Sequence, residues 1–204
     1  MHGHSIRIFV STYRRLEAVS GSSGTGNGSV SFSAAPNPAA SSRSGRVLVN
    51  GQPFTVTQAG VAFTSIRMRC GGPQLTDASG NVWSSDGAAN YSVTNAAIAN
   101  TNTPALYQTD AWSTSTLQYS FNVPNGSFTV KLKFAESYLT QRNQRVVNIL
   151  VNGNLVASGF DILAYTNPNT AYDLSIPVNV TNGQITISLV PVTGTAKINA
   201  IEID

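Results

Sequence analysis

The feature that most constrains the fold is a series of alternating segments joined by tight turns within residues 106–153. Apolar side chains occupy every second position of 117–123 and of 128–134, which gives each segment one apolar face. This period of two is typical of half-buried β-strands, and no long stretch shows the 3.6-residue period of an amphipathic helix. Asn125-Gly126 and Asn152-Gly153 supply the dipeptide that most strongly favours a hairpin turn. The stretch therefore predicts antiparallel strands.

Similar segments recur along the chain at regular spacing. The other expected strands are 29–33, 46–49, 53–58, 65–70, 146–151, 155–157, 174–180, 185–190 and 197–203. We therefore expect an all-β chain whose main part is an antiparallel, jelly-roll-like β-sandwich. Residues 75–106 show no such pattern, and long ordered loops on a rigid scaffold are frequent places for binding sites.

The composition restricts the classes of function. Charged residues make up only 10% of the chain, whereas about a quarter is usual in globular proteins. The formal net charge is +3 with scattered basic residues, so no nucleic-acid-binding face is expected. The single cysteine, Cys70, excludes an internal disulfide and a cysteine-based metal site. Both histidines, His2 and His4, lie at the start, which leaves the body of the chain without a histidine for a catalytic triad.

Catalysis is not expected from the acidic residues. Hydrolysis of a glycosidic bond usually needs two carboxylates that flank the bond. Most of the nine acids lie beside Gly, Ser, Asn or Thr, and none forms a recognisable pair. The chain also lacks a nucleophile elbow, and its glycine-rich SGTGNG lies between expected strands rather than before a helix. We therefore predict a non-catalytic chain with no cofactor and no metal site.

The chain divides into three parts. We expect 1–15 to be a disordered or misannotated arm, 16–60 to be a partial β unit of three strands with a thin core, and 63–204 to be a complete domain. Two segments of 16–60, SGSSGTGNGSVSFS and AASSRSGRVLVNGQPFTVTQ, resemble the C-terminal half of a BACON-type domain, a β-sandwich repeat common in secreted bacterial carbohydrate-active proteins. The resemblance implies a larger multidomain secreted parent, which would explain why no signal peptide is visible.

Residues 63–204 resemble the malectin domain along nearly the full length of that family. The matching segments are IRMRCGG (66–72), TDASGNVWSSD (76–86), LYQTDAW (106–112), FAESY (134–138) and KINAIEI (197–203). The resemblance implies a jelly-roll-like sandwich whose loops hold a sugar. In the characterised member of the family, an aromatic cluster and one aspartate hold a glucose disaccharide.

The sugar-contacting positions of the family fall on five residues of this chain, namely Tyr91, Trp112, Tyr138, Leu139 and Gly194. Tyrosine is retained at 91 and 138, and Trp112 replaces a tyrosine with a larger ring that still stacks but lacks the hydroxyl. Leu139 replaces a phenylalanine. The aspartate, expected shortly before KINAIEI, falls at about Gly194, and its loss removes a charged acceptor whose hydrogen bonds to sugar hydroxyls would contribute about 1.5–3 kcal/mol. These departures preserve general sugar binding better than they preserve specificity for a glucose disaccharide.

Two aromatic residues have structural alternatives. Trp112 precedes the strand 117–123, whose inward-facing set is complete without it, so we expect its ring to face a loop-lined cleft. A core position for the ring is the alternative. Tyr107 follows the apolar Leu106, so we expect its ring to lie in the core. There it would support the site without contacting the sugar.

The polar candidates are interpreted mainly as structural. We expect Glu136 to tether a loop by accepting hydrogen bonds from backbone N–H groups, in preference to a catalytic role. Asp77, Asn81 and Asp86 lie in a loop rich in Gly and Ser, where their oxygens can accept turn hydrogen bonds. Their spacing matches no known calcium loop.

The sequence thus predicts a non-catalytic module that binds an oligosaccharide or polysaccharide by ring stacking and hydrogen bonds. The alternative is a structural or adhesion module of a large surface protein without sugar binding. Convergence of Tyr91, Trp112 and Tyr138 on one exposed concave surface would favour sugar binding. No segment is apolar for long enough to span a membrane, and we expect an extracellular or cell-surface location.

Overall fold

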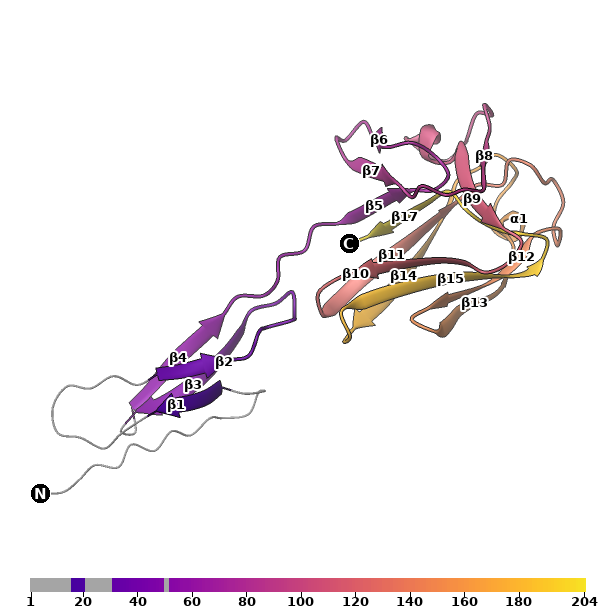
Figure 1. Cartoon of the computed structure of the whole chain (residues 1–204). Helices are drawn as coiled ribbons and strands as arrows, with labels where there is room; N and C mark the ends of the chain where they lie inside the picture. The colour runs from indigo at the N-terminus through magenta and orange to yellow at the C-terminus, as the bar shows by residue number, and fades with distance from the viewer. Residues whose placement is uncertain (1–15, 21–30, 50–51) are drawn as a thin grey trace, which may run out of the picture. The chain divides into compact units, whose positions relative to one another are not determined.

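The computed structural model describes residues 16–20, 31–49 and 52–204, and the chain divides into two compact units, residues 1–62 and 63–204. The described elements are strands, apart from one four-residue helix and one 3-10 turn (Figure 1). The expected all-β class is therefore confirmed.

The first unit contains two antiparallel pairs of strands. These pairs are β1 (Leu16–Ser20) with β2 (Ser31–Ala34), and β3 (Arg43–Val49) with β4 (Gln52–Gln58). The strand β1 was not expected, because its sequence LEAVS places Ala18 beside Val19 and so breaks the alternation. The unit therefore has four described strands where the sequence predicted three.

The described core of the first unit is small. Among the residues of this unit whose burial is described, Val47 is the one buried hydrophobic residue. Asn37 links two loops, since its amide donates hydrogen bonds to the carbonyl oxygens of Ser41 and Ala59. The expected arm at 1–15 lies outside the described residues.

The second unit is a β-sandwich with two main sheets. The four-stranded sheet has the order β10 (Leu117–Asn122), β15 (Gln184–Thr193), β12 (Val146–Val151), β13 (Asn154–Phe160). The six-stranded sheet has the order β14 (Tyr172–Val180), β11 (Gly126–Phe134), β17 (Ala200–Ile203), β5 (Ile66–Arg69), β7 (Val82–Ser85), β6 (Leu75–Thr76). Neighbouring strands are antiparallel except β5 and β7, which are parallel.

The two sheets enclose one apolar core. Alternate residues of β11 from Phe128 to Phe134 are buried and pack with the buried aliphatic residues of β12 and β15. Ile66 and Met68 of β5 and Cys70, which follows the strand directly, lie on the core side. Because apolar burial is the main driving force of folding, this core accounts for the stability of the unit.

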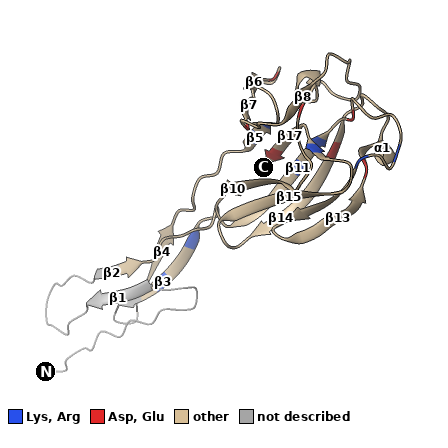
Figure 2. Cartoon of the chain, turned by 45° about the vertical axis from the view of Figure 1, so that its right-hand side comes forward, with Lys and Arg blue, Asp and Glu red and all other residues tan. Residues whose placement is uncertain are grey.

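The face of β11 opposite the core is covered at Lys133. Lys133 is only 9% exposed, because its amine lies 2.6 Å from a carboxylate oxygen of Asp173 and 5.7 Å from the centre of the Trp83 ring. Basic segments in blue and acidic segments in red lie close together near the labels β11 and β17 in Figure 2. An ion pair and a cation–π contact together offset the loss of hydration. The tryptophan of β7 therefore covers this end of the sheet.

A third, three-stranded sheet lies beside the sandwich and has the order β16 (Ala196–Ile198), β9 (Thr109–Ser113), β8 (Tyr91–Val93). The prediction of a single strand over 197–203 was wrong, because the chain leaves the three-stranded sheet at Asn199 and joins the six-stranded sheet. The buried amide of Asn199 donates to the carbonyl oxygens of Tyr107 and Thr109, and its oxygen accepts from the N–H of Ala135. These bonds satisfy the backbone groups that the change of sheet leaves unpaired.

The stretch 75–106 is not one irregular loop, because it contains β6, β7, β8 and the 3-10 turn η1 (Pro104–Leu106). The strands have two to four residues, which is too short for a period to show in sequence. Asp77 accepts hydrogen bonds from the N–H groups of Ser79 and Asn81 and from the indole of Trp83. The expected turn hydrogen bonds of Asp77 are therefore present.

Among the described residues, the helix α1 (Ile162–Tyr165) and the turn η1 are both far too short to cross a membrane.

We predict that a polypeptide of residues 63–204 folds without the first unit. Both apolar clusters of the second unit draw all their members from Phe63 onward, so the excision removes no core side chain. Near-UV circular dichroism and a cooperative thermal transition would check this. A shortened chain without a near-UV signal would contradict it.

We also predict that amide hydrogens exchange faster in β3 and β4 than in β11. A two-stranded sheet with little buried apolar area opens at lower free energy than a strand at the centre of a sandwich. Hydrogen exchange followed by mass spectrometry measures both regions in one sample. Equal protection would show that the first unit is as stable as the second.

Candidate functional site

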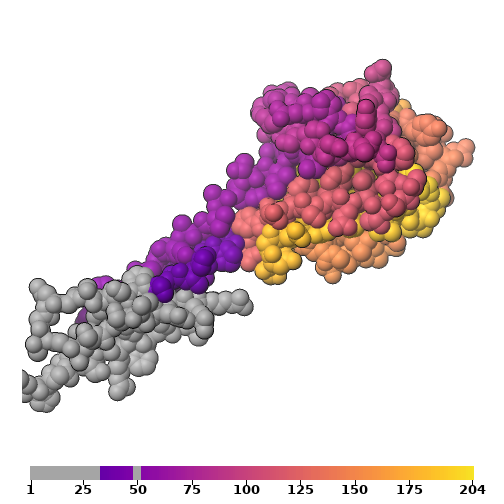
Figure 3. All heavy atoms as spheres, viewed as in Figure 1, coloured from indigo at the N-terminus to yellow at the C-terminus, as the bar shows by residue number. Residues whose placement is uncertain are grey.

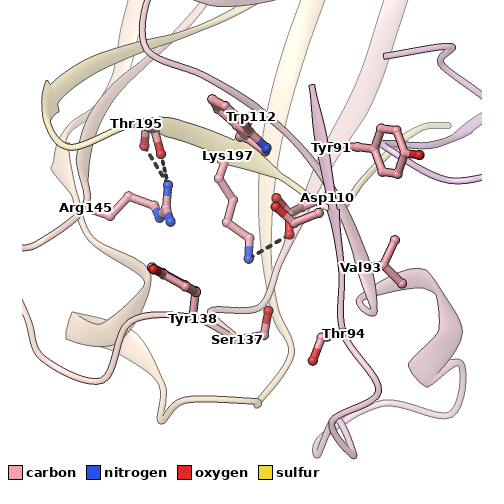
Figure 4. A pocket seen from close by; sticks show the side chains of 11 residues that line it. Tyr91, Val93, Thr94, Asp110, Trp112, Ser137, Tyr138, Arg145, Thr195 and Lys197 are labelled. Atoms are coloured by element: carbon pink, nitrogen blue, oxygen red, sulfur yellow. Dashed lines mark hydrogen bonds and ion pairs between the residues drawn. The ribbon is translucent and has the colours of Figure 1, made fainter. Parts of the chain in front are cut away.

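The second unit carries a hollow of about 550 Å³ at the third sheet. Its lining comes from β8, β9 and β16, from the loop after β11 and from Arg145 just before β12. The lining residues are Tyr91, Ser92, Val93, Thr94, Asp110, Trp112, Ser137, Tyr138, Arg145, Thr195 and Lys197 (Figure 4). In the space-filling view, the pink residues near position 110 and the yellow residues near position 195 lie side by side on one face (Figure 3).

Strand alternation explains which side chains face the hollow. Asp110 and Trp112 are two positions apart on β9 and therefore share one face of the sheet. Lys197 on β16 lies directly opposite Trp112, and Ser92 on β8 lies directly opposite Asp110. Directly opposite residues share a face, so these four residues form the floor of the hollow.

The three predicted aromatic residues all line the hollow, but in different ways. Trp112 is half-buried on the floor, and Tyr138 is 85% exposed on the loop after β11. Tyr91 lies opposite Ala111, whose side chain points into the core, so Tyr91 belongs to the other face of the sheet. Its ring points away from the hollow (Figure 4), and it contributes to the rim. The structure therefore brings Trp112 and Tyr138 together and leaves Tyr91 at the edge.

Two predicted site residues do not line the hollow. The backbone N–H of Leu139 donates a hydrogen bond to Glu136 Oε1 at 3.2 Å, but its side chain is outside the lining. Gly194 has a φ of +70°, and a Cβ there would lie 2.5 Å from the carbonyl oxygen of Gln144. An aspartate therefore cannot occupy this position without movement of the backbone. Its neighbour Thr195 reaches the hollow instead.

Tyr107 supports the site from within the core, as the sequence predicted. The side chain is buried in the smaller apolar cluster, and its hydroxyl donates a 2.6 Å hydrogen bond to Asp173 Oδ1. Burial raises the pKa of the Tyr107 phenol well above its usual range, and the neighbouring carboxylate of Asp173 raises it further. The hydroxyl is therefore a fixed donor.

Beneath the hollow lies a cluster of four charged side chains, Glu136, Arg145, Lys197 and Asp110. Glu136 is 1% exposed, and its Oε2 lies 2.7 Å from Arg145 Nε. Lys197 Nζ lies 3.1 Å from Asp110 Oδ2 and 3.8 Å from Glu136 Oε1. Arg145 also donates hydrogen bonds to the carbonyl and the hydroxyl of Thr195. The cluster contains two positive and two negative groups and is formally neutral.

Glu136 also holds the loop that carries Tyr138. Its Oε1 accepts hydrogen bonds from the backbone N–H groups of Tyr138 and Leu139, which is the loop tether expected from the sequence. Burial alone would raise the pKa of Glu136, but Lys197, Arg145 and the N–H of Tyr138 outweigh burial and lower it. Glu136 is therefore held in its ionised form.

Asp110 behaves differently from Glu136. Burial raises the pKa of its carboxyl group, and the adjacent Lys197 only partly opposes this rise. One of its two oxygens faces Lys197. Each of the carboxylates of Asp110 and Glu136 is paired with a cation, and Glu136 is inaccessible, so the two do not flank an open groove as hydrolysis of a glycoside requires.

The described residues contain no group of three or more His, Cys, Asp or Glu side chains that could hold a metal ion. What the hollow offers is a half-buried ring, an exposed ring and several hydrogen-bonding groups. This combination is suited to binding a polar ligand with apolar faces.

Sequence reasoning missed the polar part of the site, namely Asp110, Arg145 and Lys197. The signal was present in LYQTDAW, since Asp110 and Trp112 have the i, i+2 spacing of a shared strand face. The segment was not recognised as a strand because Gln108, Thr109 and Asp110 are consecutive polar residues. Trp112 therefore lies within β9 and not, as expected, at the entrance to the following strand.

Comparison of the sequence with known families and proteins gives a consistent result. The family described as "Malectin domain" matches residues 64–203. Malectin-B from Xenopus laevis is 33% identical over 95 residues, which cover 46% of this chain and 34% of that protein. The match thus spans about a third of the length of this curated relative.

Solved structures share the fold at low identity. The ANX1 ectodomain from Arabidopsis thaliana has a TM-score of 0.61 and 20% identity, and the match covers 68% of this chain and 47% of that one. A beta-glucuronidase from Bacteroides uniformis has a TM-score of 0.62 and 17% identity, and the match covers 78% of this chain and 22% of that one. At these identities the likeness shows the fold alone.

We predict that Glu136→Gln lowers the free energy of unfolding by about 3–5 kcal/mol, because it leaves the largely buried Arg145 without its carboxylate and removes the more distant of the two carboxylates that face Lys197. Urea denaturation measures this change. Asp204→Asn is the matched control, since Asp204 pairs with Lys131 at 2.8 Å but its side chain is 33% exposed. The control should lose at most about 1 kcal/mol. An equally small loss for Glu136→Gln would contradict the importance of the buried cluster.

Proposed function

The chain belongs to the malectin domain family, since the family match covers residues 64–203, and from this premise we propose that the second unit binds carbohydrate without catalysing a reaction. Malectin domains are known as carbohydrate-binding, non-catalytic modules. The curated relatives are longer than the match, so the proposal is confined to the module.

One observation carries the proposal, namely the joint presence of Trp112 and Tyr138 on one hollow. A pyranose has an apolar face made by its C–H groups, and this face packs on an aromatic ring. The half-buried indole of Trp112 offers a fixed surface, and the exposed Tyr138 offers a second ring on the other side of Lys197 (Figure 4). The buried Glu136 holds the Tyr138 loop, so less conformational entropy is lost when a ligand binds.

The remaining groups of the hollow would contact the hydroxyls of the sugar. Ser137 and Thr195 can donate and accept hydrogen bonds, Arg145 and Lys197 only donate, and Asp110 only accepts. Such a mixture fits a neutral sugar, and we propose a glucose-containing or related oligosaccharide as ligand. Neither Leu139 nor Gly194 lines the hollow, so we expect a preference that differs from that of the characterised family member.

We further propose that the module belongs to a larger extracellular or cell-surface protein, in which the first unit is the C-terminal half of a BACON-type domain. The low content of charged residues supports this location. The fold is also shared with the solved ANX1 ectodomain. Antiparallel pairing of β3 with β4 is compatible with part of a β-sandwich repeat.

A glycan array probed with the whole chain tests the proposed function. Binding to a set of related glucose-containing glycans is the expected result. A chain that binds no glycan on the array, although its circular dichroism shows it folded, would favour the structural or adhesion module.

We predict that Trp112→Ala abolishes sugar binding and lowers stability by less than the roughly 3–5 kcal/mol of a core aromatic, because the ring is only half-buried. Isothermal titration with a bound glycan and a thermal melt measure the two effects. Tyr91→Ala is the matched control, and we expect it to change affinity little because its ring lies on the other face of the sheet. Loss of binding in the control with full binding in Trp112→Ala would place the sugar at the rim.

A further inference from the structure

The hollow needs a group that accepts hydrogen bonds from sugar hydroxyls, and position 194 cannot provide it. Gly194 has no side chain, and a Cβ at this position would collide with the carbonyl oxygen of Gln144. An acceptor must come from another element of the hollow.

Asp110 is the carboxylate that lines the hollow among the residues that the structure describes. It projects from β9 on the same face as Trp112, two positions away, so the ring and the carboxylate are neighbours on the floor. The residue is 5% exposed, and its Oδ2 is fixed by Lys197 Nζ at 3.1 Å. A carboxylate held in this way is already oriented before a ligand arrives.

The second oxygen of Asp110 remains available. No described residue donates a hydrogen bond to Oδ1, and Oδ1 is also not among the fully buried side-chain atoms that lack a partner. It is therefore accessible from the hollow. Ionised carboxylates accept up to about four hydrogen bonds, so Oδ1 can take two hydroxyl donors.

We propose that Asp110 is the specificity-determining residue of this site and that it accepts hydrogen bonds from adjacent hydroxyls of a neutral sugar whose face stacks on Trp112. The inference rests on the proposed function and deepens it. Lys197 has two roles, because it fixes the carboxylate and neutralises it. The acceptor lost at position 194 is thus replaced from a different strand.

The charges around the hollow favour a neutral sugar over a uronate. Lys197 is paired with Asp110, and Arg145 is paired with Glu136, so the four charges balance. A uronate would bring a carboxylate close to Oδ1 of Asp110 without an unpaired cation to compensate it. Like charges in a partly buried site repel each other strongly. The ligand is therefore a neutral hexose oligosaccharide with at least one free vicinal diol.

The experiment compares binding of the whole chain to two matched probes, a glucose oligosaccharide and the oligosaccharide of the same linkage that carries glucuronate. Wild-type protein should bind the neutral probe at least about tenfold more tightly. Asp110→Asn should weaken binding of the neutral probe by about tenfold to 100-fold, because it replaces a charged acceptor with an amide. The same variant should also bind the two probes with more nearly equal affinity, which a purely structural role would not produce.

Asp173→Asn is the matched control, since Asp173 also pairs with a lysine but lies outside the hollow. It should leave both affinities unchanged. Unchanged neutral-probe affinity in Asp110→Asn, or tighter binding of the glucuronate probe by wild-type protein, would overturn the inference. If Asp110→Asn fails to fold by near-UV circular dichroism, the wild-type comparison of the two probes decides alone. If wild-type protein binds neither probe nor any other glycan, the proposed function itself fails.

Discussion

The site depends on a buried, formally neutral cluster of four charges. Glu136 lies in the loop after β11, and Arg145 directly precedes β12. Lys197 lies on β16 and Asp110 lies on β9. The cluster therefore ties together segments that are distant in sequence. Buried charges are costly unless each is paired and hydrogen-bonded, and here each carboxylate has a cation at 2.7 or 3.1 Å. The arrangement fixes the loop of Tyr138 and the floor of the hollow at the same time.

In the function that we propose, this organisation separates the two parts of sugar recognition. Apolar contact would come from Trp112 on a strand and from Tyr138 on a tethered loop, while the sugar hydroxyls would contact the accessible edge of the charged cluster. Because Gly194 leaves no room for a side chain, the acceptor that we propose is Asp110, on the strand that also carries Trp112. The ring and the acceptor are then held in register by the same backbone.

Sequence reasoning succeeded where alternation persisted and failed where side chains changed the topology. The buried series from Phe128 to Phe134 was predictable because one period extends through the whole strand. The break at Asn199 was not, since its cause is three hydrogen bonds to distant backbone groups. Tyr91 illustrates the same limit, because its strand was too short to show which face the ring occupies. The pairing of the four charged side chains could not be predicted, because contacts between elements that are distant in sequence leave no local sequence pattern.

The most direct test of the account uses the two tryptophans of the chain as internal probes. The indole of Trp112 lies on the hollow, while the indole of Trp83 is buried and donates to Asp77 Oδ2 at 3.0 Å. In a ¹⁵N-resolved NMR titration of the whole chain with a glucose oligosaccharide, we expect the indole signal of Trp112 and the amides of Tyr138 and Leu139 to shift. The indole signal of Trp83 should stay in place. A saturating titration that leaves the Trp112 signal unmoved would contradict the assignment of the hollow as the sugar site.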